Sequence, residues 1–124
     1  MKDLIITATY KTPLVDLRRN GKMVIKGRSI PENGYIFYQP VFKWIEEYET
    51  RPIAKTTLDL ELEYINTISS KCILDIFKGF ERLKKKGFEV LVNWHYKEDD
   101  PDMLQAGQDY ESIINIDFSY IKEA

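Results

Sequence analysis

Apolar and polar residues along this chain alternate with two different periods, and the switches between these periods predict an α/β fold. Alternation at every second residue is typical of a half-buried strand, and apolar residues three and four positions apart are typical of an amphipathic helix. With the turn residues between them, the periods predict five strands, Thr12–Asp16, Lys22–Arg28, Thr57–Tyr64, Phe88–Tyr96 and Ile116–Ile121. They also predict three helices, Asn33–Glu49, Ser69–Lys86 and Asp100–Ile113. Pro40 lies inside the first helix, so we expect a kink or a restart near Gln39.

The third predicted strand indicates how these elements pack. Its leucines alternate with three acidic residues, Asp59, Glu61 and Glu63. If the acids face water, the helices must cover chiefly one face of the sheet, and right-handed crossovers then advance the strands in one direction. We therefore expect a single domain over residues 1–124, built on an open, mixed and mostly parallel five-stranded sheet.

The junction between this strand and the second helix is the strongest candidate site. Tyr64 to Lys71 pass from the strand into the helix through small polar residues, and Thr67 falls at the helix N-terminus. Free backbone N–H groups and the helix dipole favour an added anion there. The Thr67 hydroxyl is therefore a candidate site of modification, with Ser69 and Ser70 as alternatives. The competing interpretation is that Thr67 is an ordinary helix N-cap.

Topology is expected to bring three loops to the same edge as Thr67. The second, third and fourth strands, if parallel, all end there, so Pro31–Asn33, Asn66–Thr67 and His95–Asp100 should converge. Lys71 lies one helical turn beyond Thr67, either as an ordinary solvated lysine or within reach of a phosphate. Core packing is the default for the aromatic residues of the first helix, but one or two should be exposed. The expected partner-binding residues are Pro31, Glu32, Asn33, Tyr35, Tyr38, Asn66, Lys71 and His95.

Composition narrows the functional classes. The chain has 124 residues, 44% of them hydrophobic, and a net charge of −2, which argues against nucleic-acid binding. Its single cysteine, Cys72, excludes an internal disulfide and a multi-cysteine metal site. Cys72 is either a buried structural residue or a thiol with a depressed pKa. Glycines are scattered, so no phosphate-binding loop is indicated. No segment resembles a secretion signal or a membrane span, so we expect a cytoplasmic protein without a cofactor or resident metal.

An enzymatic alternative rests on the only histidine. His95 is followed by four acidic residues, Glu98, Asp99, Asp100 and Asp102, which could form a divalent-metal or acid/base cluster. Against this alternative, a lone histidine supplies only one imidazole, and a solvated loop before a helix ordinarily carries acidic residues. A third alternative is a constitutive scaffold with the same fold and no chemistry at Thr67.

Four segments give the chain a family resemblance. In order they are Gly27–Asn33, Phe37–Trp44, Tyr64–Lys71 and Val92–Tyr96. Their sequences and spacing resemble the SiaC family of bacterial regulatory phosphoproteins, and the similarity extends from about Thr12 to Phe118. Members of this family look like the STAS domains of anti-sigma-factor antagonists, so the resemblance implies a STAS-like single domain.

The resemblance also implies a mechanism of partner switching. A partner Ser/Thr kinase phosphorylates the threonine of an Asn-Thr pair, which is Thr67 here, and a metal-dependent phosphatase removes the phosphate. In the best-known branch the unphosphorylated protein binds and activates a diguanylate cyclase, which controls cyclic-di-GMP and biofilm behaviour. An anti-sigma-factor-antagonist role in transcription is the alternative output. The family usually has a serine after this threonine, whereas this chain has Ile68.

Overall fold

The computed structural model describes all 124 residues and contains one six-stranded mixed sheet. The strands are β1 (Leu4–Ile6), β2 (Leu14–Leu17), β3 (Lys22–Ser29), β4 (Lys55–Ile65), β5 (Glu89–Lys97) and β6 (Asp117–Glu123). They lie side by side in sequence order. The first three strands pair antiparallel, and β3 to β6 pair parallel. The α/β class is confirmed.

The expected number of strands was one too few. The additional strand is β1, which has only three residues and pairs antiparallel with β2 at the sheet edge. Such a short segment shows too little alternation to be recognised by its period. The other five strands occur where they were predicted, with boundaries that differ by at most two residues.

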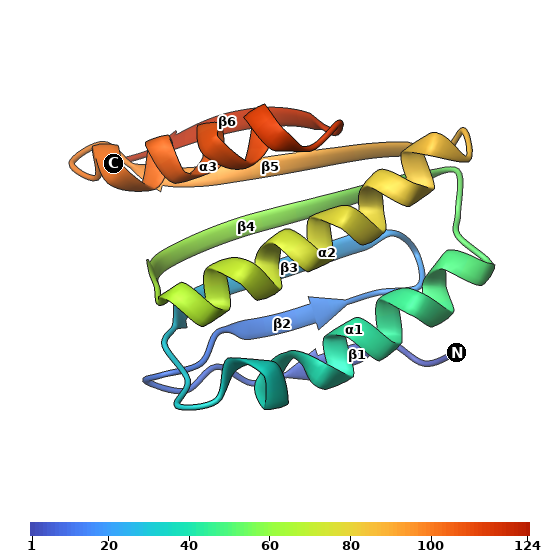
Figure 1. Ribbon diagram of the computed structural model, residues 1–124, viewed down its shortest axis with the longest axis horizontal. Coiled ribbons are helices and arrows are strands. Elements are labelled where there is room, and N and C mark those ends of the chain that lie inside the picture. The colour runs from blue at the N-terminus through green and yellow to red at the C-terminus, as the bar shows by residue number, and fades with distance from the viewer.

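Three helices cover a single face of this sheet (Figure 1). They are α1 (Gly34–Thr50), α2 (Thr67–Lys85) and α3 (Pro101–Ile113). Each follows a strand and leads to the next parallel strand, so right-handed connections place all three on the same side. The expectation of a one-sided layer is confirmed. Of the kink or restart expected near Gln39, the restart was wrong, because α1 continues through Pro40 to Thr50.

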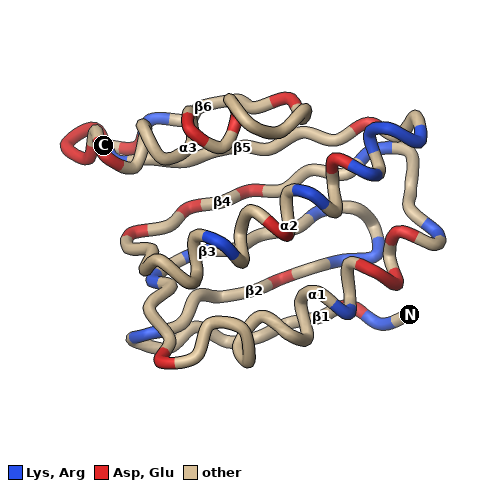
Figure 2. Tube along the Cα trace, in the orientation of Figure 1, with Lys and Arg blue, Asp and Glu red and all other residues tan.

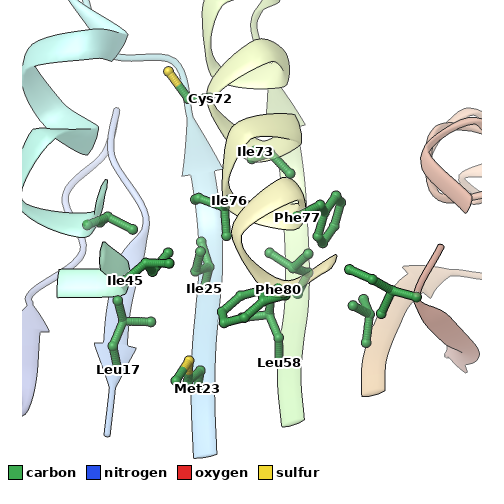
Figure 3. Close-up of a cluster of buried hydrophobic side chains, with 14 of the residues drawn as sticks. Leu17, Met23, Ile25, Ile45, Leu58, Cys72, Ile73, Ile76, Phe77 and Phe80 are labelled. Atoms are coloured by element: carbon green, nitrogen blue, oxygen red, sulfur yellow. The ribbon is translucent and has the colours of Figure 1, made fainter. Parts of the chain in front are cut away.

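The core fills the space between the helices and the sheet (Figure 3). The apolar face of α2 contributes Cys72, Ile73, Ile76, Phe77 and Phe80. These side chains meet alternate residues of the central strands, including Met23, Ile25 and Leu58. Because α2 is the central helix and its buried residues are fully enclosed, its N-terminal turn has a fixed position relative to the sheet.

The opposite face of the sheet carries the charged residues that were expected to face water. Figure 2 shows acidic residues spaced along β4, and they pair with cations on the neighbouring strand. Lys26 Nζ lies 2.9 Å from Glu61 Oε2, and Arg28 Nε lies 3.4 Å from Glu63 Oε2. The one-sided layer therefore leaves an open and charged sheet face.

Candidate functional site at the N-terminus of helix α2

Three parallel strands end at the same edge of the sheet, as the sequence predicted. β3 ends at Ser29, β4 at Ile65 and β5 at Lys97, and each strand is followed by a loop that leads to a helix (Figure 1). The loops after β3 and β4 are directly bonded. The Asn66 backbone N–H donates to the carbonyl of Ser29 at 3.0 Å, and the Asn66 side-chain amide donates to the carbonyl of Pro31 at 3.2 Å.

Asn66, and not Thr67, caps helix α2. Its backbone is extended (φ −81°, ψ 172°), and its side-chain oxygen accepts from the Ser69 N–H at 2.9 Å. Its carbonyl accepts from the Ser70 N–H at 2.9 Å. The interpretation of Thr67 as the N-cap was therefore wrong. Thr67 is the first residue of the helix and is exposed.

The electrostatic surroundings of Thr67 suit an anion. Helix geometry leaves the N–H groups of Thr67 and Ile68 without an intrahelical acceptor, so the partial positive charge of α2 lies at the hydroxyl. No acidic residue occupies the first turn of α2. Lys71 lies one turn further along, is exposed, and takes part in none of the salt bridges of the protein. Within the first turns of α2, a negative group on Thr67 would thus meet the positive helix end and Lys71 and no acidic residue.

The alternative hydroxyls at this junction are less accessible than Thr67. Ser69 is fully buried, and its hydroxyl lies 2.8 Å from that of Ser29. Ser70 is half-buried, and its hydroxyl lies 2.9 Å from the hydroxyl of Tyr110. A kinase that needs an exposed acceptor would therefore find it at Thr67.

Tyr38 was expected to contact partners, and this expectation was wrong. Its side chain is fully buried, and its hydroxyl lies 2.6 Å from that of Ser29. Burial raises its pKa to about 12, because the ionised form would lose its hydration. Together, the hydroxyls of Tyr38, Ser29 and Ser69 join α1, β3 and α2 behind the Thr67 turn. Tyr38 supports this turn from inside.

The loop before α1 is divided between surface and interior. Pro31 is buried, which contradicts its expected exposure, whereas Glu32 and Asn33 are exposed. Glu32 forms an ion pair with Lys11. Asn33 caps α1 by accepting from the Ile36 N–H at 3.1 Å. Of these three residues, only Glu32 and Asn33 present side chains that a partner can reach.

Exposed apolar side chains occur in the first turns of both α1 and α2. Tyr35 and Ile36 in the first turn of α1 are 49% and 69% exposed, and Ile68 in the first turn of α2 is 37% exposed. The side chain of Ile68 packs against Gly34, the first residue of α1, and thereby connects the N-terminal ends of α1 and α2. The approach is so close that a Cβ atom added to Gly34 would lie only 2.7 Å from the Cγ2 atom of Ile68. We call Tyr35, Ile36 and Ile68 the apolar patch. Ile36 was missed from the sequence because the helical period alone does not show which apolar residues of an aromatic-rich helix stay outside.

A second set of exposed side chains lies near the ends of β3 and β4. The Arg28 guanidinium lies 4.4 Å from the ring centre of Tyr10 and 5.2 Å from that of Tyr64. Tyr10 is 75% exposed and Tyr64 is 58% exposed. This cation–π stack holds two aromatic rings at the surface, beside the end of β4. No local pattern predicts this stack, because Tyr10 lies far from the other two residues along the chain.

His95 does not join the Thr67 loops. The strand was predicted to end at Tyr96 with His95 opening a loop, but β5 continues to Lys97. His95 therefore lies within the strand, on the open sheet face, where its register partners are Glu61 of β4 and Ile121 of β6. The ring bonds to none of the acids that follow it in sequence. Asp100, for example, caps α3 through the Met103 N–H.

The predicted cluster of His95 with Glu98, Asp99, Asp100 and Asp102 was therefore wrong in its choice of acids. His95 instead lies between Asp59 and Glu123, and Glu61, His95 and Glu123 hold ligand-type atoms within 4.8 Å of one another. Both ring nitrogens already contact carboxylates, and Lys26 already balances Glu61. These contacts satisfy the cluster without a metal ion.

Of the two roles considered for Cys72, the structure supports that of a buried structural residue. Its side chain is fully enclosed, and burial together with nearby Asp75 raises its pKa. A thiol with a raised pKa is a poor nucleophile at neutral pH. The helix dipole does not activate it.

Comparison with known families identifies the family of this chain. The model of the SiaC family, described as regulatory phosphoproteins, matches residues 6–123. The chain belongs to the SiaC family. Membership assigns it to a class of regulatory proteins and confirms the resemblance found in the four sequence segments. None of its three helices has the length and apolarity that crossing a membrane requires.

Other relatives of this SiaC-family chain come from Pseudomonas aeruginosa. An uncharacterized protein of strain UCBPP-PA14 is 29% identical over 120 residues, or 96% of this chain and 95% of that protein. SiaC of P. aeruginosa superposes with a TM-score of 0.90 at 28% identity, covering 99% of this chain and 100% of that one. SiaC also occurs in a crystal structure of the diguanylate cyclase SiaD with its activator SiaC. That structure matches with a TM-score of 0.89 at 27% identity, covering 98% of this chain and 100% of the matched one.

Proposed function

We propose that this protein is a phosphorylation-controlled switch whose modified atom is the Thr67 hydroxyl. A partner Ser/Thr kinase adds the phosphate, and a metal-dependent phosphatase removes it. The observation that carries this proposal is the position of Thr67. It is exposed at the first position of a helix whose first turn holds no acid, and a neighbouring side chain already performs the capping.

The proposed output is activation of a diguanylate cyclase by the unphosphorylated form. Support comes from the similarity to SiaC in its complex with SiaD, which covers nearly the whole chain. The apolar patch provides a suitable surface, because exposed aromatic and aliphatic side chains are common anchors at protein interfaces. Such a switch acts on cyclic-di-GMP signalling in the cytoplasm of a bacterium.

Phosphorylation would act by masking this surface. A phosphate adds about −1.5 to −2 charges and strong hydrogen-bond acceptors beside the patch. The helix terminus tolerates the charge, so the fold stays unchanged. An apolar partner surface that binds Ile68 would have to remove water from the phosphate, and this cost would weaken binding. Lys71 is placed to pair with the phosphate and hold it over the first turn.

The geometry of the open sheet face gives little support to the enzymatic alternative. Both nitrogens of His95 contact carboxylates at 2.8 and 2.9 Å, so neither is free to take a proton from a substrate. An anti-sigma-factor-antagonist output would use the same Thr67 surface with another receiver. A constitutive scaffold would bind its partner without modification.

Phosphopeptide mapping tests the modification. The protein is incubated with ATP and its partner kinase, and its intact mass and modified residue are determined. We expect one phosphate, on Thr67, and none on a Thr67→Ala variant. A phosphate found only on Ser69 or Ser70 would overturn the assignment, and no phosphate at all would favour the scaffold. Cyclic-di-GMP synthesis by the receiver, measured with and without the protein, then separates the cyclase output from the transcriptional one.

A further inference from the structure

His95 occupies an unusual position on the open sheet face, outside the Thr67 surface. Its Nε2 lies 2.9 Å from Asp59 Oδ1 on β4, and its Nδ1 lies 2.8 Å from Glu123 Oε1 on β6. The side chain is only 17% exposed. One imidazole on β5 thus contacts both neighbouring strands at once.

The chemistry of these contacts restricts the protonation state. A neutral imidazole carries one N–H, and its other nitrogen presents a lone pair. An ionised carboxylate accepts hydrogen bonds only, so a lone pair facing its oxygen at hydrogen-bond distance would be repelled. Two hydrogen bonds to two carboxylates therefore require the imidazolium, which donates from both nitrogens.

We propose that protonated His95 is a latch that ties β4, β5 and β6 together across the open sheet face, and that its deprotonation releases the end of β6. The released end is β6 because this strand is at the edge and pairs with β5 alone. Glu123 is its last residue. β4, in contrast, is held between β3 and β5.

Most of the charged groups around the ring are acidic, which favours a retained proton. β4 contributes Asp59 and Glu61, β6 contributes Glu123, and β3 contributes Lys26, whose ammonium is engaged by Glu61. The hollow beside the ring, about 280 Å³ in volume, is also lined by Glu63, Lys97 and Asp100. Burial lowers the pKa of His95, but the hydrogen bonds to Asp59 and Glu123, together with the negative charges of Asp59 and Glu61, outweigh it and raise the pKa above its ordinary value. The helices cover the other face and contribute no charge here.

The direction of the pH effect follows from this shift. A histidine whose pKa is higher in the folded state stabilises the fold fully below its unfolded pKa of about 6.5. This contribution is lost as the pH rises through the folded value. The latch is therefore closed below about pH 6.5 and opens as the pH rises through the folded-state pKa of His95.

The chain has a single histidine, so its ring resonances in an NMR titration need no assignment by mutation. We expect a pKa above about 6.5, and a lower pKa in both Asp59→Asn and Glu123→Gln variants. Glu98→Gln is the matched control, since Glu98 is an exposed acid that pairs with Lys122 at 3.9 Å and does not contact the ring. An ordinary or lowered pKa in the native protein, or a pKa that Glu123→Gln leaves unchanged, would overturn the proposal.

Amide hydrogen exchange tests the release of β6. After correction for intrinsic rates, protection of the amides in residues 121–123 should fall by about three- to tenfold as the pH passes the pKa of His95. This loss should be absent in His95→Gln, while amides of β3 keep their protection. A pH-independent β6 in the native protein would refute the latch. One equivalent of Zn²⁺ at pH 7 should leave the ring resonances of His95 unchanged. A stoichiometric shift of these resonances would contradict the latch and indicate a metal site instead.

Discussion

Replacement of Ile36 by aspartate should remove receiver binding while leaving the fold intact. Ile36 is 69% exposed in the first turn of α1, so its side chain contributes little to the core. The first turn of α1 contains no acidic residue. A carboxylate there is favoured by the helix dipole by about 0.3–1 kcal/mol, so the free energy of unfolding should not fall.

The expected loss of affinity follows from the exposed area of Ile36. Complete burial of an isoleucine is worth about 1.5–3 kcal/mol, and the exposed two-thirds of this side chain would contribute about 1–2 kcal/mol to binding. Burying an unpaired carboxylate in its place adds a penalty of at least about 2 kcal/mol. The sum exceeds 2.7 kcal/mol, so we expect at least about a 100-fold loss in affinity.

The chain offers a closely matched control for this variant. Ile113, the last residue of α3, is 65% exposed and lies outside the apolar patch. Titration calorimetry with the diguanylate cyclase receiver should show weak or no binding for Ile36→Asp and native affinity for Ile113→Asp, with both variants folded by circular dichroism. Equal affinities of the two variants would exclude the apolar patch from the interface.

Three further predictions concern the Thr67 turn itself. Thr67→Ala should bind the receiver like the native protein, whereas Thr67→Asp should bind more weakly in calorimetry, with a difference that shrinks as salt rises beyond about 0.1 M; equal affinity of the two would argue against electrostatic masking. Asn66→Ala should lower the free energy of unfolding by about 1–3 kcal/mol in urea denaturation, since it loses the cap and the bond to Pro31, while Thr67→Ala stays within about 0.5 kcal/mol of native. Tyr38→Phe should lose about 0.5–1.5 kcal/mol in the same assay, and a neutral effect would mean that the buried hydroxyls do not support the turn.

The sequence predicted those features that depend on local periodicity. The leucine and acid alternation of β4 indicated which face is buried, and the parallel order of β3, β4 and β5 followed from the helices between them. From these two facts the position of Thr67 at the sheet edge could be derived. Only β1, which has three residues, escaped this reasoning.

Features that depend on contacts between distant residues could not be predicted in this way. The buried hydroxyl of Tyr38 finds its partner in Ser29, nine positions earlier, and the capping role of Asn66 depends on an extended backbone that the pattern does not specify. His95 was assigned neighbours along the chain, but its actual partners are 36 and 28 positions away. Side-chain partners across a sheet follow from register, which one-residue errors in strand ends obscure.

The central claim is that a phosphate on Thr67 controls access to the receiver surface. It is tested most directly by comparing the receiver affinity of the unmodified protein with that of a preparation phosphorylated stoichiometrically by its kinase and verified at Thr67 by mass spectrometry. We predict that the phosphorylated protein binds at least about 100-fold more weakly, a difference of about 2.7 kcal/mol. Equal or tighter binding by the phosphorylated protein would contradict the account.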